Sequence, residues 1–147
     1  MNNPPPPSAE SAGLFRRLAA MVYDAFLLLA LWFLSTVVLV ALNGGEALPP
    51  LMAQLILLPF IFIVSCAFYS WFWIHSGQTL GMKTWKIRLV SEQGKAVDLK
   101  QSLLRILAAL LSISCFGLGY VWLLFDKRRC TWHDHLSRTR VIDVSKR

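Results

Sequence analysis

Long stretches without charged residues dominate the pattern of hydrophobic and polar positions along the chain. The first stretch runs from Leu18 to Leu42 and contains a single charged residue, Asp24. The second runs from Ala47 to Ile74 and contains none. A helix needs about 20 apolar residues to cross the hydrocarbon core of a bilayer. The pattern therefore predicts two transmembrane helices, over residues 18–42 and 51–74.

A third apolar stretch, residues 102–125, is less regular than the first two. Arg105 interrupts it near its start, and Gly117 and Gly119 follow two serines in its middle. Glycine inside a helix costs about 1 kcal/mol relative to alanine, although small residues also let membrane helices pack closely. This stretch is therefore either one full span or a broken, re-entrant pair of half-helices.

The connection between the second and third stretches has the pattern of a β-strand. Trp85–Val90 alternates apolar and polar residues at its start, as a half-exposed strand does. Ser91–Gly94 is a candidate turn, after which Lys95–Val97 returns as a second strand. The sequence thus predicts an all-α membrane protein, with two to four transmembrane or re-entrant helices and a small cytoplasmic β-hairpin. Whether Thr139–Ile142 adds a third strand is left open by the pattern.

Basic residues predict the orientation of the chain. Arg16 and Arg17 precede the first span, whereas the loop over residues 43–50 has no lysine or arginine. The second connection carries Lys83, Lys86, Arg88, Lys95 and Lys100. Because lysine and arginine are enriched in cytoplasmic loops, the N-terminus and the second connection are predicted to be cytoplasmic. The basic tail favours the cytoplasm too, which requires a re-entrant third stretch; a full span would place it outside.

The overall composition agrees with a membrane protein and argues against several other classes. The chain is 56% hydrophobic and 16% charged, against roughly 45–50% and about 25% in soluble domains. Its net charge of +7 lies in segments that meet anionic lipid headgroups, so no nucleic-acid partner is expected. The sequence contains no hydrolase, phosphate-loop, dinucleotide or zinc-protease motif. We therefore expect neither an enzyme nor a cofactor.

Three segments divide the chain. Residues 1–13 contain the run Pro4–Pro7 and are expected to form a disordered or polyproline arm. Residues 14–143 form the membrane domain, and residues 144–147 end the tail. The first apolar stretch is longer than the roughly 7–15 residues of a signal peptide, so we interpret it as a retained anchor.

Asp24 is the first residue that could carry chemistry. A charged group in the membrane costs at least about 2.5–3.5 kcal/mol, so its carboxylate is expected to face protein or water. Arg17 lies seven residues earlier and therefore projects from the same helix face. Arg105, near the start of the third stretch, is the expected partner of Asp24. The carboxylate either locks helices together or titrates during transport.

The tail contains a second candidate, in which His133 and His135 flank Asp134. Such a group suggests a metal site or a proton relay. The sequence offers no further paired cysteines or histidines that would complete a recognisable ligand set, so no metal is expected. An interfacial helix, with Trp132 at the membrane surface, is the favoured interpretation.

Taken in order, these pieces resemble the RDD family of bacterial integral membrane proteins, named for one arginine and two aspartates. The matching segments are Arg16–Asp24, Gly77–Lys83, Ser102–Arg105, Leu124–Arg129 and Trp132–Asp134. The resemblance implies that Arg17, Asp24 and Asp134 are the signature residues, with Trp132 in place of the family's usual leucine. It also implies a multi-pass protein of the bacterial inner membrane, of uncertain molecular function, with a suggestion of transport that includes sodium/proton exchange.

Two classes of function remain open. In one, the protein moves an ion or small solute as a homo-oligomer, because two or three spans enclose little volume. In the other, it is a non-catalytic component that assembles with itself or with another membrane protein. In both classes Arg17, Asp24, Arg105 and Asp134 are expected to form a polar network near the cytoplasmic membrane surface. Beyond the lipid bilayer, the sequence identifies no ligand.

The orientation leads to a direct test with reporter fusions. A reporter that is active only outside the cytoplasm should be inactive when fused after Arg147, because the basic tail resists translocation. The same reporter inserted in the loop over residues 43–50 should be active and serves as the control. Activity of the fusion after Arg147 would contradict a cytoplasmic tail.

Overall fold

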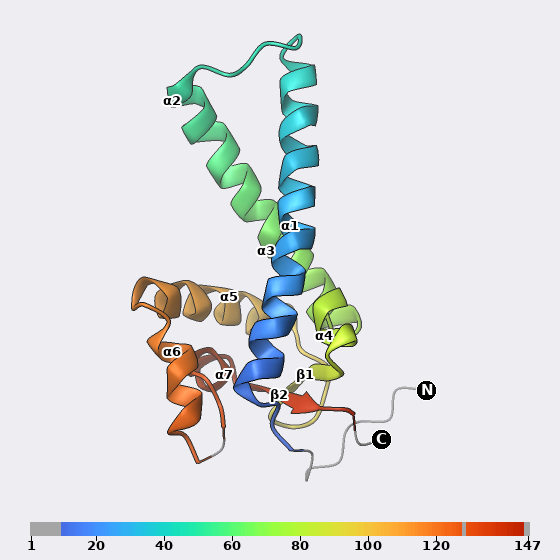
Figure 1. Ribbon diagram of the computed structural model, residues 1–147, viewed down its shortest axis with the longest axis vertical. Helices are drawn as coiled ribbons and strands as arrows, with labels where there is room; N and C mark the ends of the chain where they lie inside the picture. Colours follow the sequence, from blue (N-terminus) through green and yellow to red (C-terminus); the bar gives the residue numbers. More distant parts are fainter. Residues whose placement is uncertain (1–9, 128, 146–147) are drawn as a thin grey trace.

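Two long helices dominate the computed structural model, which describes residues 10–127 and 129–145 (Figure 1). The first is α1 (Leu14–Leu42). The second is continuous through α2 (Pro50–Met52), the π-helical η1 (Ala53–Leu57) and α3 (Leu58–His75). Both are long and apolar enough to cross a membrane, which confirms two span-forming helices. Residues 1–9 of the Pro-rich arm lie outside the described residues, as do residues 128, 146 and 147.

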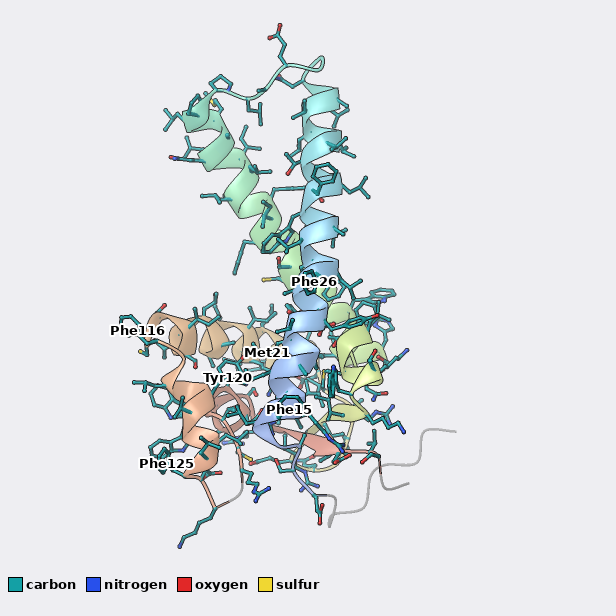
Figure 2. All side chains as sticks on the ribbon, in the orientation of Figure 1. Phe15, Met21, Phe26, Phe116, Tyr120 and Phe125 are labelled. Atoms are coloured by element: carbon teal, nitrogen blue, oxygen red, sulfur yellow. The ribbon has the colours of Figure 1, made fainter. Side chains whose placement is uncertain are left out.

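The two long helices cross and then diverge toward their shared loop (Figure 1). Between them, the indole nitrogen of Trp32 donates a hydrogen bond to Ser65 Oγ over 3.0 Å. A proline begins the second helix, at a position where its missing N–H costs no helical hydrogen bond. Many apolar side chains of these two helices face outward, including the 69% exposed Phe26 on α1 (Figure 2).

The third apolar stretch is broken in the middle. It consists of α5 (Leu99–Ser114), followed by α6 (Leu118–Val121) and η2 (Trp122–Leu124). The helix stops because Phe116 and Gly117 both have positive φ, at 54° and 76°, a left-handed conformation that ends helices. The two halves meet at 106°, so α5 lies across the long helices while α6 turns away from it (Figure 1). The broken pair of helices, rather than one straight span, is the arrangement found.

The small antiparallel sheet is present, but its second strand was predicted wrongly. β1 (Ile87–Ser91) pairs with β2 (Thr139–Asp143) of the tail, so that Ile87 lies opposite Asp143 and Ser91 opposite Thr139. Lys95–Val97 is not a strand; its Val97 side chain is instead buried in the hydrophobic core. The alternating pattern identified β1 correctly, but it carries no information about which distant segment supplies the other edge.

The arm, the second connection and the tail meet in one layer at the base of α1 (Figure 1). Ser11 forms a bridge with Ile142, and Ala12 N–H donates to the carbonyl oxygen of Val141 over 2.9 Å. Ser11 and Ala12 belong to the segment that was expected to be a disordered arm. Both are instead hydrogen-bonded along β2. The core of this layer consists of Ala12, Ala20, Met82, Ile87, Leu89, Val97 and Val141.

Two short helices connect this layer to α1 and α5. α4 (Leu80–Thr84) packs on α1, and α7 (Trp132–Ser137) packs on α5. The contact at α4 is very close, since a Cβ atom added to Gly81 would lie 2.3 Å from the carbonyl oxygen of Ala20. Only a residue without a side chain fits between α4 and α1.

The close contact at Gly81 predicts a large effect from a single methyl group. Gly81→Ala should destabilise the protein by about 1–3 kcal/mol, because the new Cβ collides with backbone that cannot easily move. Gly13→Ala is the control, since a Cβ there meets nothing within 4 Å. The measurement is the midpoint of thermal unfolding in detergent. Equal midpoints for the two variants would contradict the packing described for α4.

Candidate functional site

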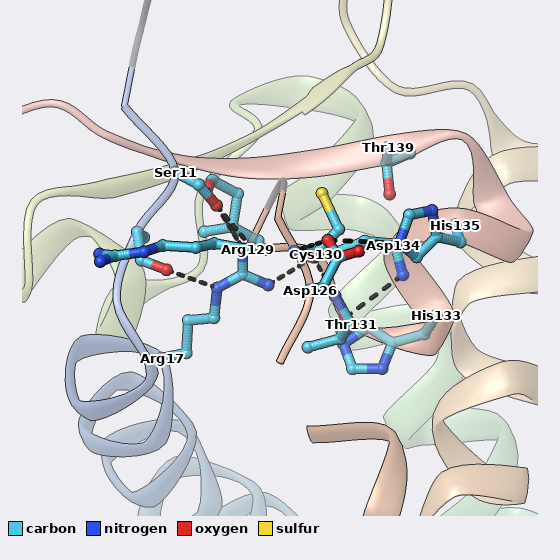
Figure 3. A network of polar contacts seen from close by, with 12 residues as sticks. Ser11, Arg17, Asp126, Arg129, Cys130, Thr131, His133, Asp134, His135 and Thr139 are labelled. Atoms are coloured by element: carbon cyan, nitrogen blue, oxygen red, sulfur yellow. Dashed lines mark hydrogen bonds and ion pairs between the residues drawn. The ribbon is translucent and has the colours of Figure 1, made fainter. Parts of the chain in front are cut away.

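A carboxylate shared by two arginines lies where α1, α5 and α7 meet. Asp134 Oδ2 is 2.5 Å from Arg17 Nη1, and Asp134 Oδ1 is 2.5 Å from Arg105 Nη1. The three side chains are only 0–7% exposed. Figure 3 shows this region with Arg17 and Asp134 labelled. We call these three residues the buried ion cluster.

Asp134 is held in place by the start of its own helix. Thr131 precedes α7 and accepts a hydrogen bond from Asp134 N–H, while Thr131 N–H donates to Asp134 Oδ2 over 3.1 Å. This reciprocal arrangement is a capping box, which fixes the first turn of a helix. The pattern Thr-x-x-Asp could have been recognised in the sequence, and Thr131 is a functional residue that the sequence analysis missed.

The two arginines connect the cluster to the rest of the fold. Arg17 Nε donates to the carbonyl oxygen of Ala12 over 3.0 Å. Arg105 Nη1 donates to Thr139 Oγ1 over 2.9 Å, at the first residue of β2. The Arg105 guanidinium also lies 5.4 Å from the ring centre of Trp73 on α3, a distance suited to a cation–π contact. The cluster therefore joins the arm, β2 and the helices of all three apolar stretches.

Electrostatics keep the central carboxylate charged. Burial alone would raise the pKa of Asp134, but the nearby charges of Arg105 and Arg17 outweigh it and hold this pKa well below its usual range. Burial, assisted by the charge of Arg105, lowers the pKa of the neighbouring His133 to about 3. At neutral pH the cluster thus contains an ionised aspartate beside an uncharged imidazole, which packs against the ring of Tyr120.

Asp24 forms a separate site, and its expected pairing with Arg105 is wrong. The Asp24 side chain is buried and accepts hydrogen bonds from Thr79 Oγ1 at 2.5 Å and from Gly81 N–H at 2.9 Å. Both donors belong to the segment that begins α4. Of the four residues expected to form one network, Arg17, Arg105 and Asp134 come together, whereas Asp24 anchors α4 to α1.

A cavity of about 460 Å³ adjoins both sites. Its walls are mainly apolar side chains of the membrane helices, such as Leu28 and Ile61. Asp24, Arg105 and His133 contribute polar atoms to its lining. Among the described residues, His133 Nδ1 is buried without a hydrogen-bond partner. The cavity could hold a small, largely apolar molecule with a polar end.

Comparison with known proteins links this arrangement to one family. The family model described as the RDD family matches residues 11–138. The match includes all three residues of the buried ion cluster and also Asp24. No curated protein and no solved structure matches the chain.

The buried ion cluster predicts an unequal response to two identical substitutions. Asp134→Asn removes the counter-charge of two buried arginines and should destabilise the protein by about 3–5 kcal/mol. Asp143→Asn is the matched control, because Asp143 pairs with an Arg16 side chain that is 38% exposed. Exposed pairs contribute only about 0–1 kcal/mol. The midpoint of unfolding by heat or by SDS should separate the two variants, and similar shifts would contradict the role given to Asp134.

Proposed function

The chain belongs to the RDD family of integral membrane proteins, and on this premise we propose that it is a non-catalytic membrane component that assembles as a homo-oligomer. The observation that supports this proposal is how the charges within the apolar stretches are used. Asp24 and Arg105 are the charged residues of those stretches, and both are engaged within the chain. These contacts favour a structural role for both side chains over a role in moving an ion across the membrane.

The shape of the long helices supports assembly. Beyond their crossing, α1 and the second helix diverge (Figure 1), and side chains on both remain uncovered, including Phe33 at 73% and Ile63 at 62% exposed. Membrane helices associate through close van der Waals packing and interhelical hydrogen bonds. A helix from a second copy would fill the wedge between them, and lipid chains would cover the outer faces.

The orientation proposed for this protein places the small sheet layer in the cytoplasm of a bacterial cell. Strands that share hydrogen bonds lie on one side of a bilayer, so the pairing of β1 with β2 supports a common side for the second connection and the tail. The basic residues of these segments favour the cytoplasmic side. The break between α5 and α6 would then enter the membrane from that side, with the 97% exposed Phe116 at its tip (Figure 2).

Transport of an ion or small solute by the oligomer is the second candidate function. The cavity favours transport, because this cavity lies between the membrane helices and is lined in part by Asp24 and Arg105. A titrating Asp24 would need to release Thr79 and Gly81 during the cycle. The hydrogen bonds that hold Asp24 therefore weigh against transport, and the cavity weighs for it.

Asp24→Asn distinguishes the two candidates. Asparagine keeps one acceptor oxygen for the two donors, Thr79 and Gly81, and a buried donor that is left without an acceptor costs about 1–3 kcal/mol. For an assembly component, we expect a lower thermal midpoint and a weaker oligomer. We also expect no sodium or proton flux in liposomes that depends on Asp24. Native mass spectrometry and a flux assay on the same preparations provide the measurements.

Glu46→Gln is the matched control, because it makes the same change from carboxylate to amide in the exposed loop between the long helices. It should leave stability, oligomer and flux unchanged. A wild-type protein that is monomeric in nanodiscs would overturn the assembly proposal. Flux that is lost in a stable, fully assembled Asp24→Asn protein would support transport instead.

A further inference from the structure

Three potential metal ligands converge in the tail, outside the buried ion cluster. A carboxylate oxygen of Asp126, the Sγ of Cys130 and an imidazole nitrogen of His135 lie within 4.8 Å of one another (Figure 3). We propose that these residues form a binding site for a divalent transition-metal ion of the zinc class. The inference does not depend on the proposed assembly, because it concerns other residues and a different ligand.

The local fold brings the three side chains together. Arg129 N–H donates to the carbonyl oxygen of Asp126 over 2.9 Å, and Cys130 N–H donates to Asp126 Oδ2 over 2.9 Å. These two bonds close the loop, so that Asp126 and Cys130 face the same point. Thr131 then starts α7, whose second turn directs His135 back toward the loop (Figure 3). Each ligand is thus positioned by backbone hydrogen bonds.

The distances suit a tetrahedral ion. Zinc bonds of about 2.0–2.3 Å place neighbouring ligand atoms roughly 3.2–3.8 Å apart. His135 Nε2 and Asp126 Oδ2 are separated by 3.5 Å, within that range. Since every pair of ligand atoms lies within 4.8 Å, the thiol needs to move by about an ångström at most to complete the shell.

The ligand types fit the same class of metal. Zinc sites combine thiolate, imidazole and carboxylate ligands, and three protein ligands leave a fourth position for water or another molecule. One carboxylate and one thiolate together balance the charge of a divalent ion, which matters beside the basic Lys127 and Arg129. Imidazole and thiolate select zinc-like metals over magnesium or calcium.

Access to the site is open. The His135 and Asp126 side chains are 41% and 17% exposed, so an ion can reach them from solvent. The expectation that the tail holds no metal was based on the two histidines that flank Asp134. In the structure, Asp134 forms ion pairs with the two arginines and His133 packs against Tyr120. Of the two histidines, only His135 lies close to Cys130.

Cobalt titration of the full-length protein tests this site. The protein is purified in detergent without a histidine tag, kept reduced, and titrated with Co²⁺, which reports thiolate ligation by a charge-transfer absorption band. We expect one ion per chain, a thiolate-to-cobalt band, and loss of the band when Zn²⁺ displaces the cobalt. Cys130→Ser should abolish the band, and His135→Ala should weaken Zn²⁺ binding at least about tenfold, since it removes one of three ligands.

Cys66→Ser and Cys115→Ser are matched controls, because Cys66 lies in α3, Cys115 lies in the turn between α5 and α6, and neither belongs to the group of three ligands. Both the Cys66→Ser and the Cys115→Ser variant should retain the band. An independent measurement uses the Cys66→Ser/Cys115→Ser protein with its site intact, in which Zn²⁺ should protect Cys130 from alkylation. No stoichiometric metal in the wild type, a band that persists in Cys130→Ser, or alkylation unaffected by Zn²⁺ would each overturn the proposal.

Discussion

The fold depends on one carboxylate, Asp134, that two buried arginines share. Burying three ionised groups costs several kcal/mol for each, and only close pairing with additional hydrogen bonds offsets that cost. Asp134 meets this requirement with both carboxylate oxygens, because Arg17 and Arg105 approach from different helices. An alternative arrangement of α1, α5 or α7 would leave at least one of these charges buried without its partner. The ion cluster therefore selects one packing of three elements that apolar contacts alone would hold less specifically.

Asp24, the second buried carboxyl group, likewise holds two elements together, in this case α1 and α4. Asp24 makes no ion pair with any of the described residues; its carboxyl group accepts hydrogen bonds from a hydroxyl and a backbone N–H at the start of α4. Gly81 makes this possible, because only glycine lets α4 approach α1 closely enough. At Asp134 and at Asp24, a buried polar side chain attaches the small sheet layer to a membrane helix. The buried acidic and basic side chains thus connect the small sheet layer to the membrane helices.

Features that depend on composition could be predicted from the sequence, and features that depend on distant partners could not. The two long helices could be predicted from the length of the apolar stretches alone. The break in the third stretch was one of two alternatives that the sequence left open. The partner of β1 could not be derived, because alternation at Ile87–Ser91 identifies a strand without naming its neighbour. Asp24 was assigned to Arg105 for a similar reason: helical spacing gives the face of a residue, but not the segment that covers that face. Thr131 did have a local signal, the capping box with Asp134, that could have been recognised.

The buried ion cluster contains two guanidinium groups and one carboxylate, so it carries an excess positive charge that the surroundings must stabilise. The remaining donors of Arg17 are directed at neutral oxygen atoms, including the carbonyl of Ala12. Arg105 combines the Thr139 hydroxyl with the face of the Trp73 ring, whose quadrupole attracts a cation. The same charge disfavours protonation of the nearby His133, whose pKa is lowered mainly by burial. The electrostatic environment of Asp134 therefore explains why the arm, the tail and α3 all meet at this point, although they are far apart in sequence.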